Sequence, residues 1–362
     1  MLNVNQTQQV SPFLVFFLIH SMQIGIGVLT FERVISEEAG HDAWMSILPA
    51  ALLSHLLLWL IYSVVTKNDQ DIISIHQSLL GKWVGNVLSL ALLCYFALIV
   101  LQIVRAYIDV IRAWIFPDTP IWLLALLFLL LSYYFVLGDF RVVAGICFFG
   151  VLLPLPLLLL KIYPLQEGHV TNLIPFLEAD ATSLLKASKE MTFSYVGIEF
   201  LLLYYPFIKN GRSSQRYAHF GLLFTTFIYL FSSLVTFMYF SQGQLQHVVW
   251  PTLDLWKTVD FPFIERFEYV GIAVWLLVIL PQMALGLWCI LRGVNRMITI
   301  HTRLIGYGIV LSLIVVASLI QGREAVNALN DITNQISFIV LAIYIPCLFI
   351  LSKIRRKGSQ QQ

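Results

Sequence analysis

Two glycines one residue apart, Gly25 and Gly27, interrupt the first long apolar stretch of the sequence. Each glycine is about 1 kcal/mol less favourable than alanine inside a helix, so the chain unwinds easily at this point. In a lipid bilayer an unwound segment persists only where protein or a cavity satisfies its freed N–H and C=O groups. The pair therefore predicts either a broken membrane helix or, since small residues let helices approach closely, a helix-packing contact.

A second segment of small and polar residues, Ser194 to Glu199, interrupts the sixth apolar stretch and includes Val196 and Gly197. In transporters built from inverted repeats, the two broken helices occupy corresponding positions. Glu199 should lie near mid-membrane, where an unpaired carboxylate is costly, so we expect it to be protonated, hydrogen-bonded or facing a cavity. Unwound backbone at the two breaks would offer donors to a ligand carboxylate and acceptors to an ammonium group.

Other polar side chains also fall inside apolar stretches. Tyr95 and Ile99 stand one turn apart in the third stretch, and Gln282 and Gly286 share a face of the eighth. Each pair could line a central cavity, or could join helices through a hydrogen bond or close packing. His20, about one turn before the glycines, is an ionisable candidate, and its cheaper alternative is a neutral side chain bonded to a backbone carbonyl.

One end of the third stretch carries charged and polar side chains at helical spacing: Gln102, Arg105, Asp109 and Arg112. Residues three or four apart on a helix are neighbours on one face. Because these four lie toward the outer surface, they predict either the wall of an outer vestibule or a structural ion pair.

The composition identifies the class of protein that holds these residues. Of 362 residues, 59% are hydrophobic and 12% are charged, whereas a soluble domain has about 25% charged residues. The sequence therefore predicts a membrane protein that lies in the lipid bilayer. A net charge of +2, with no basic block longer than residues 353–357, argues against a nucleic-acid partner.

Apolar stretches long enough to cross about 30 Å of hydrocarbon occur ten times. We place them at residues 11–31, 43–66, 84–114, 119–137, 142–160, 184–208, 217–240, 267–291, 304–320 and 333–352. They suit an all-α polytopic membrane protein, a single membrane domain over residues 1–362 built as five plus five helices. The first repeat would cover about residues 11–160 and the second about residues 184–353.

Lysines and arginines set the expected orientation, because loops rich in them stay in the cytoplasm. If both termini are cytoplasmic, the inner loops and tail hold thirteen of these residues and the outer side holds eight. The bias predicts cytoplasmic termini, a cytoplasmic loop at residues 209–216 and an external segment at residues 241–265. In that segment aromatic and charged residues are mixed and Pro251 follows Trp250, which predicts short interfacial helices with a break at the proline.

Signatures of enzymes and cofactor sites are missing from the sequence. The glycine pair lacks the strand and the third glycine of a dinucleotide site, and neither a Walker A loop nor a zinc-protease helix occurs. The four cysteines lie in apolar stretches without paired spacing, so we expect neither a disulfide framework nor a metal site. The residues therefore predict a protein without cofactors that is not an enzyme and that binds a small molecule between broken helices.

Several segments resemble the B subunit of bacterial spore germinant receptors. The resemblance is carried by Ile24 to Thr30, Gly197 to Glu199 and, above all, Trp250 to Leu253 followed by Ile264 to Glu268 and Trp275. That family is similar to the amino acid, polyamine and organocation transporter superfamily, with the inverted five-helix repeat and broken helices 1 and 6 of LeuT-like proteins. Many members have Leu-Pro after the glycines, whereas Phe31-Glu32 stand here, so the outer end of helix 1 is expected to be arranged differently.

The resemblance implies an integral subunit of the spore inner membrane that binds a small germinant, commonly an amino acid, and signals germination. It also implies two partner proteins, a larger A subunit and a lipoprotein C subunit. It places the ligand among helices 1, 3, 6 and 8, which here carry Gly25, Gly27, Tyr95, Ile99, Val196, Gly197, Glu199, Gln282 and Gly286.

Two other functions stay open at this point. A proton- or sodium-coupled amino acid transporter would use the same pocket, because a fold does not decide a function. A scaffold or pore for partner subunits would need no ligand, and substitutions in the pocket would then leave ligand responses unchanged.

Overall fold

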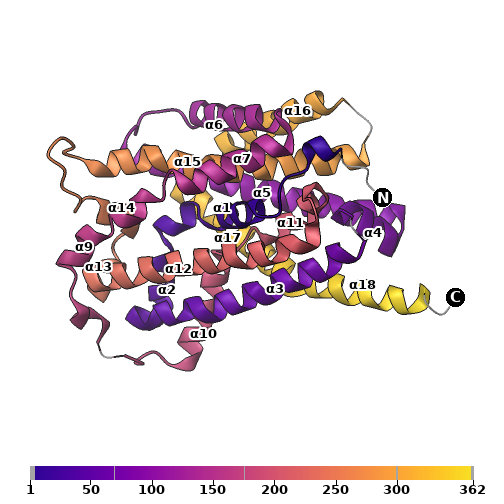
Figure 1. Ribbon diagram of the computed structural model, residues 1–362. Coiled ribbons are helices and arrows are strands. Elements are labelled where there is room, and N and C mark those ends of the chain that lie inside the picture. Colours follow the sequence, from indigo (N-terminus) through magenta and orange to yellow (C-terminus); the bar gives the residue numbers. More distant parts are fainter. Residues whose placement is uncertain (1–4, 69, 175, 299–300, 360–362) are drawn as a thin grey trace.

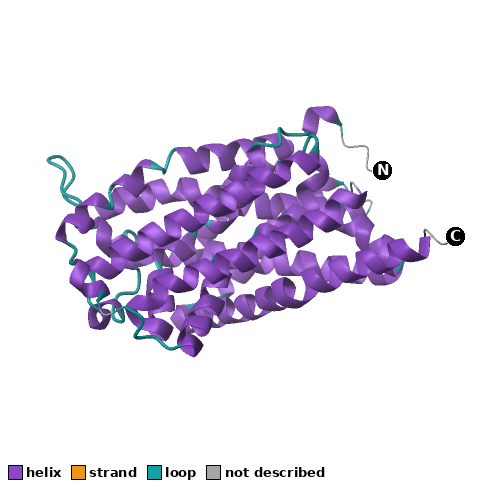
Figure 2. Ribbon diagram, turned by 60° about the horizontal axis from the view of Figure 1, so that its bottom comes forward, coloured by secondary structure: helices purple, strands orange, loops and turns teal. Residues whose placement is uncertain are grey.

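The computed structural model describes residues 5–68, 70–174, 176–298 and 301–359, which form an elongated bundle of helices (Figure 1). Within these residues the only extended pairings are two isolated bridges, one between Val10 and Ile208 and one between Phe261 and Ile264. Helices fill the bundle, and most of its loops gather at the two ends (Figure 2). The prediction of an all-α protein is confirmed.

Seven of the described helices are long and apolar enough to cross a membrane: Phe31–Lys67, Lys82–Trp114, Asp139–Glu167, Gly211–Tyr239, Phe267–Met297, Thr302–Leu319 and Gly322–Ile354. Three shorter apolar helices are Leu14–Gln23, Ile121–Val136 and Ile198–Phe207. Each of the ten predicted stretches corresponds to one of these segments. The chain is therefore a multi-pass membrane protein.

The first stretch is broken at its glycines, as predicted. Helix α1 (Leu14–Gln23) ends there, a 3-10 turn η2 (Ile26–Leu29) follows, and α2 (Phe31–Ala39) resumes the helix. Helix α2 continues well beyond the predicted end at residue 31. Its sequence is amphipathic, and hydropathy averaged over a window underestimates such a helix. It packs against α10 (Ala181–Phe193) and so extends helix 1 beyond the break.

The sixth stretch is also broken. After α10 and a short turn the chain forms η5 (Ile198–Phe200), α11 (Leu201–Tyr204) and η6 (Tyr205–Phe207). Gly197 has a φ of +116°, a left-handed conformation that favours glycine. A Cβ atom built on Gly197 would lie 2.6 Å from the Cβ atom of Met22, so the two breaks pack directly on each other.

The rest of the first half supplies long helices and one short helix. The long helices are α3 (Ile47–Asn68), α5 (Lys82–Trp114), α6 (Ile121–Val136) and α7 (Asp139–Leu152). Two prolines, Pro154 and Pro156, interrupt the fifth stretch, and α8 (Pro156–Leu159) and α9 (Ile162–Glu167) continue it. The short helix α4 (Ile72–Leu80), which hydropathy did not indicate, lies between α3 and α5 in the chain.

The second half contains α12 (Gln215–Tyr239), α15 (Phe267–Met297), α16 (Thr302–Leu319), α17 (Gly322–Ile339) and α18 (Ile345–Ser359). A π-helical turn, η8 (Val340–Tyr344), joins α17 to α18. The tenth helix thus begins at Gly322 instead of residue 333. Polar residues along one face of α17 lower the mean hydropathy of its first turns, so the sequence did not indicate a membrane helix there. These residues face a cavity described below.

The segment at residues 241–265, called the outer segment below, forms α13 (Gln242–Leu245) and α14 (Pro251–Trp256), with Pro251 in the first turn of α14. The prediction of short helices with a break at this proline is confirmed. Four more 3-10 turns complete the described elements: η1 (Gln6–Gln8), η3 (Gly40–Ser46), η4 (Val170–Leu173) and η7 (Gly211–Ser214).

The bundle places the helix breaks at its centre. Helix α1 packs between α12 and α7, while α5 packs along α15. Helix α4 and the end of α18 lie at the end of the bundle that carries both termini, and α9, α13 and α14 lie at the opposite end (Figure 1). Below, the end that carries α14 is called the outer end.

Candidate ligand-binding site

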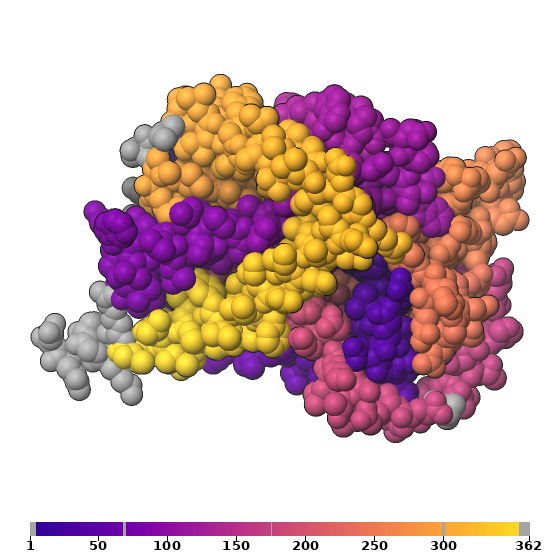
Figure 3. Space-filling model, turned by 180° about the vertical axis from the view of Figure 1, so that it is seen from behind, coloured from indigo at the N-terminus to yellow at the C-terminus, as the bar shows by residue number. Residues whose placement is uncertain are grey.

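A cavity of about 630 Å³ reaches from the outer end of the bundle to the break in helix 1. Its walls come from helix 1, α5, α10, α12, α15 and α17, and Trp250 stands at its outer rim. Seen from behind, α2 (indigo) lies between α10 (pink) and the α13–α14 segment (salmon), below α17 (yellow) (Figure 3). The cavity therefore leads from the outer end of the bundle to the residues identified in the sequence.

Side chains from neighbouring helices satisfy the backbone that the break sets free. The Gln282 amide nitrogen of α15 donates a hydrogen bond to the carbonyl of Met22 over 2.9 Å. The Tyr229 hydroxyl of α12 donates to the carbonyl of Gln23 over 2.8 Å. Both carbonyls belong to the last turn of α1, whose helical partners are lost at the break. Two helices thus hold the unwound end of α1 in place.

The residues that follow the break are held in the same way. The Trp275 indole nitrogen of α15 donates to the carbonyl of Gly25 over 3.3 Å. The Thr252 hydroxyl of α14 donates to the carbonyl of Val28 over 3.1 Å. The outer segment thus contacts helix 1 directly, so a movement of α14 would reach the break.

Glu32, in the first turn of α2, is completely buried. Its Oε1 atom accepts from the hydroxyls of Ser232 and Thr236 at 2.7 and 3.3 Å and lies 3.2 Å from that of Thr252. The Lys161 ammonium lies 3.9 Å away and contacts Ser232 at 2.5 Å. A buried ion pair thus joins α2 to α12, α14 and the fifth helix at this end of helix 1.

The carboxylate of Glu199 accepts a hydrogen bond from the freed backbone of the second break. Its Oε2 atom accepts the N–H of Gly197 over 2.9 Å, and its Oε1 atom accepts the Tyr95 hydroxyl over 2.8 Å. The Tyr95 oxygen lies 3.1 Å from the hydroxyl of Ser337, which itself lines the cavity. Glu199 is fully buried and hydrogen-bonded, one of the states expected for it. Because it occupies the N–H of Gly197, that donor is closed to a ligand.

The structure brings five of the nine predicted site residues to the cavity wall: Gly25, Gly27, Ile99, Val196 and Gln282. They come from helix 1, α5, the turn after α10, and α15, which are the four helices that the resemblance implied. A Cβ atom built on Gly25 would overlap the side-chain amide of Gln282, whereas one built on Gly27 would meet nothing within 4 Å.

The other four predicted residues lie outside the cavity wall. Tyr95, Gly197 and Glu199 form the hydrogen-bonded cluster behind it. Gly286 lies at the contact between α15 and α5, where an added Cβ atom would overlap Val100. These four positions support the wall through hydrogen bonds and close packing.

The cavity also exposes residues that the sequence had not indicated as ligand-binding: Gln23, Ser194, Tyr229 and Ser337. A signal was available for Gln23, a strongly polar side chain that directly precedes a predicted break in an apolar stretch. No comparable signal marked Tyr229, because a tyrosine in a membrane helix is equally typical of a packing position.

Charged side chains surround the mouth of the cavity. Its lining includes four acids and two arginines: Glu37, Asp109, Glu190, Asp331, Arg33 and Arg323. Arg33 pairs with Glu37 at 2.9 Å on the exposed side of α2. Arg105 is buried behind the wall and pairs with Asp109 at 3.0 Å. The third helix therefore has both features that its pattern predicted, an ion pair and a vestibule wall.

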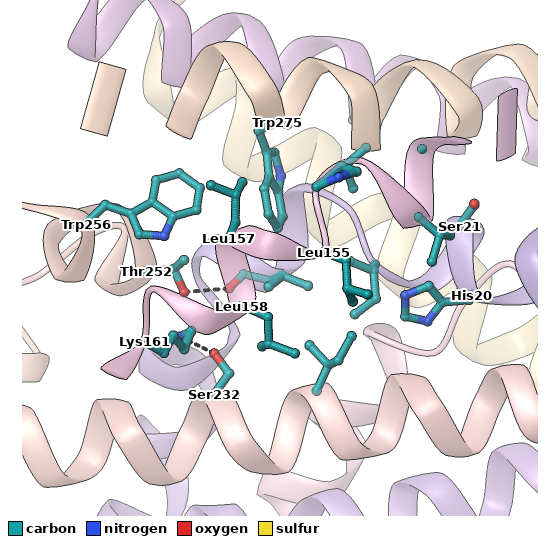
Figure 4. Close-up of a pocket in the computed structure, with 17 residues that line it drawn as sticks. His20, Ser21, Leu155, Leu157, Leu158, Lys161, Ser232, Thr252, Trp256 and Trp275 are labelled. Atoms are coloured by element: carbon teal, nitrogen blue, oxygen red, sulfur yellow. Dashed lines mark hydrogen bonds between the residues drawn. The ribbon is translucent and has the colours of Figure 1, made fainter. Parts of the chain in front are cut away.

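A smaller cavity of about 70 Å³ lies on the other side of helix 1, next to the break in the fifth helix (Figure 4). Lys161 and Ser232 line one end of it and His20 lines the other. The His20 Nδ1 atom forms a hydrogen bond with the Thr225 hydroxyl at 2.8 Å, in place of the expected backbone carbonyl. In the described part of the chain, no group of three or more His, Cys, Asp or Glu residues is placed to hold a metal ion.

Comparison with known families matches residues 9–326 to the family described as "Spore germination protein". One relative is "Spore germination protein GerQB" of Bacillus cereus, 40% identical over 349 residues, which are 96% of this chain and 97% of the relative. A more distant one is "Spore germination protein A2" of Bacillus subtilis (strain 168), 23% identical over 268 residues, which are 72% of this chain and 73% of the relative.

Comparison with solved structures shows the fold. MhsT in complex with L-phenylalanine superposes with a TM-score of 0.69 at 15% identity, covering 95% of this chain and 88% of MhsT. The nucleobase-cation-symport-1 transporter Mhp1 gives a TM-score of 0.66 at 9% identity, covering 95% of this chain and 78% of Mhp1. The predicted LeuT-like fold with broken helices 1 and 6 is confirmed.

Proposed function

The chain belongs to the spore germination protein family, and from that premise we propose that it is the membrane subunit of a spore germinant receptor. It binds a small nutrient germinant, in the first place an amino acid, in the central cavity. The observation that carries this proposal is the cavity itself, which ends at two helix breaks held open by side-chain hydrogen bonds. Unwound membrane helices in this fold typically mark a ligand site.

The mechanism is binding and closure, without bond making. A ligand shifts a protein between two states only through its different affinity for them. Here α2, α10, α17 and the segment just before α14 line the cavity and belong to separate parts of the chain, so they can close around a bound molecule. The hydrogen bond between Thr252 and Val28 links that closure to the break.

The proposed setting is the spore inner membrane, with both termini in the cytoplasm and the cavity open to the outside. The proposed partners are a larger A subunit and a lipoprotein C subunit, which would receive the conformational signal. Family membership and the charge bias of the loops support this setting.

Gly25 provides the test of the ligand site. Leucine at this position would displace the Gln282 amide and fill the space beside the break, so the Gly25→Leu variant should be present at a normal level but unresponsive to germinant. Gly25→Ala should lower sensitivity, because its added methyl group already meets Gln282. Gly145→Ala on α7 is the matched control, because Gly145 does not line the cavity and its added methyl group meets no neighbour.

The measurement combines subunit level in purified spores with the dependence of germination on germinant concentration. A packing role for Gly25 predicts another pattern, in which the leucine variant is depleted and the alanine variant behaves like the wild type. Normal sensitivity of a normally abundant Gly25→Leu protein would rule out this cavity as the ligand site and favour a scaffold function.

A coupled amino acid transporter is the second candidate, and the fold shared with symporters such as Mhp1 favours it. Both functions use one cavity, but only a transporter moves its ligand across the membrane. Counterflow of labelled amino acids in proteoliposomes separates them. Accumulation of label that depends on internal unlabelled substrate supports transport, whereas binding without accumulation supports a receptor.

A further inference from the structure

The deep end of the cavity contains two buried side-chain oxygens without hydrogen-bond partners, Oε1 of Gln23 and Oε1 of Gln282. We infer that these two oxygens form an acceptor pair that binds the ammonium group of the ligand. The inference rests on the proposed function and adds to it the polarity of the ligand group at the bottom of the site.

The orientation of both amides follows from their neighbours. The Gln282 nitrogen faces the carbonyl of Met22 at 2.9 Å, and the Gln23 nitrogen faces the carbonyl of Tyr195 at 3.4 Å. Turning either amide over would place its oxygen against a carbonyl oxygen, two acceptors without a hydrogen between them. Both amide nitrogens therefore donate to backbone carbonyls, and both amide oxygens lack a hydrogen-bond donor.

Because the two oxygens are buried, the lack of a hydrogen-bond donor costs free energy that a bound ligand can recover. Gln23 and Gln282 are 4% and 3% exposed, so little water reaches them. A buried acceptor without a donor destabilises the protein, and a ligand donor that fills the vacancy removes that penalty. A hydrogen bond from a charged donor is stronger than one from a neutral donor, which favours an ammonium group over a neutral N–H.

The charges along the cavity agree with a cationic group. The described side chains at the bottom of the cavity include no lysine or arginine, and its two arginines, Arg33 and Arg323, belong to the outer mouth, where four acids outnumber them. A narrow cleft with an excess of one sign concentrates the opposite charge. The acids at the mouth would therefore attract a ligand with an ammonium group into the cleft, and Arg33 and Arg323 are the cationic side chains of the lining that can face its carboxylate once the ammonium lies at the bottom.

The experiment uses the purified full-length protein and follows thermal stabilisation by the twenty L-amino acids. Each amino acid is paired with the carboxylic acid that lacks the amino group and with the N-trimethyl derivative, which keeps the charge but has no N–H donor. Purine and pyrimidine nucleosides form a further set with neutral N–H donors. We expect at least one amino acid to stabilise the protein and both of its analogues to fail.

Variants test the same inference by removing the oxygens. Gln23→Met and Gln282→Met should each weaken binding of the active amino acid about tenfold or more, as expected for a lost charge-assisted hydrogen bond. Gln335→Met is the matched control, because Gln335 is exposed on α17, does not line the cavity and has no buried unpartnered oxygen. It should change the affinity less than about threefold.

The outcomes separate the inference from the function on which it rests. If no probe binds the wild-type protein, the proposed function fails and the inference with it. If an amino acid binds but its des-amino or N-trimethyl analogue binds equally well, the acceptor pair is overturned while the receptor function stands. Binding of a nucleoside alone would also overturn the ammonium assignment. The wild-type comparison of analogues keeps the inference falsifiable if a glutamine variant fails to fold.

Discussion

Single side chains, and not long stretches of sequence, hold the two breaks open. Gln282 and Tyr229 occupy the carbonyls at the end of α1, and Glu199 occupies the N–H of Gly197 at the other break. In lipid each of these backbone groups would otherwise stay unsatisfied at a cost of several kcal/mol. The polar residues of these membrane helices thus have a structural task that precedes any contact with a ligand.

The buried pair of Glu32 and Lys161 leads to a prediction about stability. Glu32→Gln or Lys161→Met leaves one buried charge without its partner and should cost about 3 to 5 kcal/mol of stability. The double variant should regain most of that loss, because it removes both charges. Glu37→Gln is the control on the same helix, since its exposed pair with Arg33 is worth roughly 0.2 to 1 kcal/mol.

Thermal unfolding of the purified variants measures their stability and so tests this prediction. A double variant that is as unstable as the sum of the two single variants would show that the two charges do not act as a pair, and that the hydroxyls of Ser232 and Thr252 alone fix the outer end of helix 1.

At the level of helices, the sequence predicted the order of the segments and both breaks, because hydrophobic length and glycine are local properties. It missed the ends of amphipathic segments. Helix α2 ends at Ala39 instead of residue 31, and α17 begins at Gly322 instead of residue 333. Both extensions line the cavity, and the face of each that lines it carries polar residues. These polar residues lower the mean hydropathy, so the sequence did not indicate membrane helices there.

The site was predictable to a smaller extent than the fold. The glycines, Ile99, Val196 and Gln282 reach the cavity wall as expected. The hydrogen bond between Tyr95 and Glu199 joins residues 104 positions apart in the chain, and such a pairing depends on how helices rotate about their axes. A single sequence does not show how its helices are rotated, so it leaves open whether Tyr95 and Glu199 line the cavity or form a hydrogen bond behind its wall; the structure shows the hydrogen bond.

Glycines that serve helix packing should behave differently from Gly25. A Cβ atom on Gly221 of α12 would lie 2.5 Å from the backbone carbonyl oxygen of Phe16 on α1, a group that cannot move aside. Gly221→Val should therefore lower the amount of folded protein, while the molecules that do fold keep normal ligand affinity. Gly145→Val on α7 is the matched control, because an added Cβ atom there meets no atom within 4 Å.

Subunit abundance, followed by ligand titration of the purified remainder, checks this distinction. Normal abundance of Gly221→Val together with weakened ligand binding would contradict it. Gly221 would then affect the cavity through the contact between α1 and α12 without affecting the amount of folded protein.

For the whole molecule, germinant binding from outside the spore requires that the end of the bundle with the cavity mouth faces outward. The outer end carries the mouth of the cavity, and the opposite end carries the loop at residues 209–216. In a cysteine-free background, we predict that Phe263→Cys reacts with a membrane-impermeant maleimide added to intact cells and that Ser213→Cys does not. Phe263 is 96% exposed and Ser213 is exposed, so burial does not explain the difference.

Labelling of Ser213→Cys in intact cells, with protection of Phe263→Cys, would reverse the orientation. The cavity would then open to the cytoplasm, and a germinant arriving from outside the spore could not enter it from that side. Reaction of both positions after the membrane is made permeable serves as the control for accessibility.

The most direct test of the central claim is a structure of the complete receptor determined at saturating germinant. We predict ligand density at the bottom of the central cavity, between the backbone at Gly25 and the side chain of Gln282, with α2, α14 and α17 closer together than in the structure described here. Density in the small cavity beside Lys161, or on a partner subunit while the central cavity stays open, would contradict the assignment of this chain as the germinant-binding subunit.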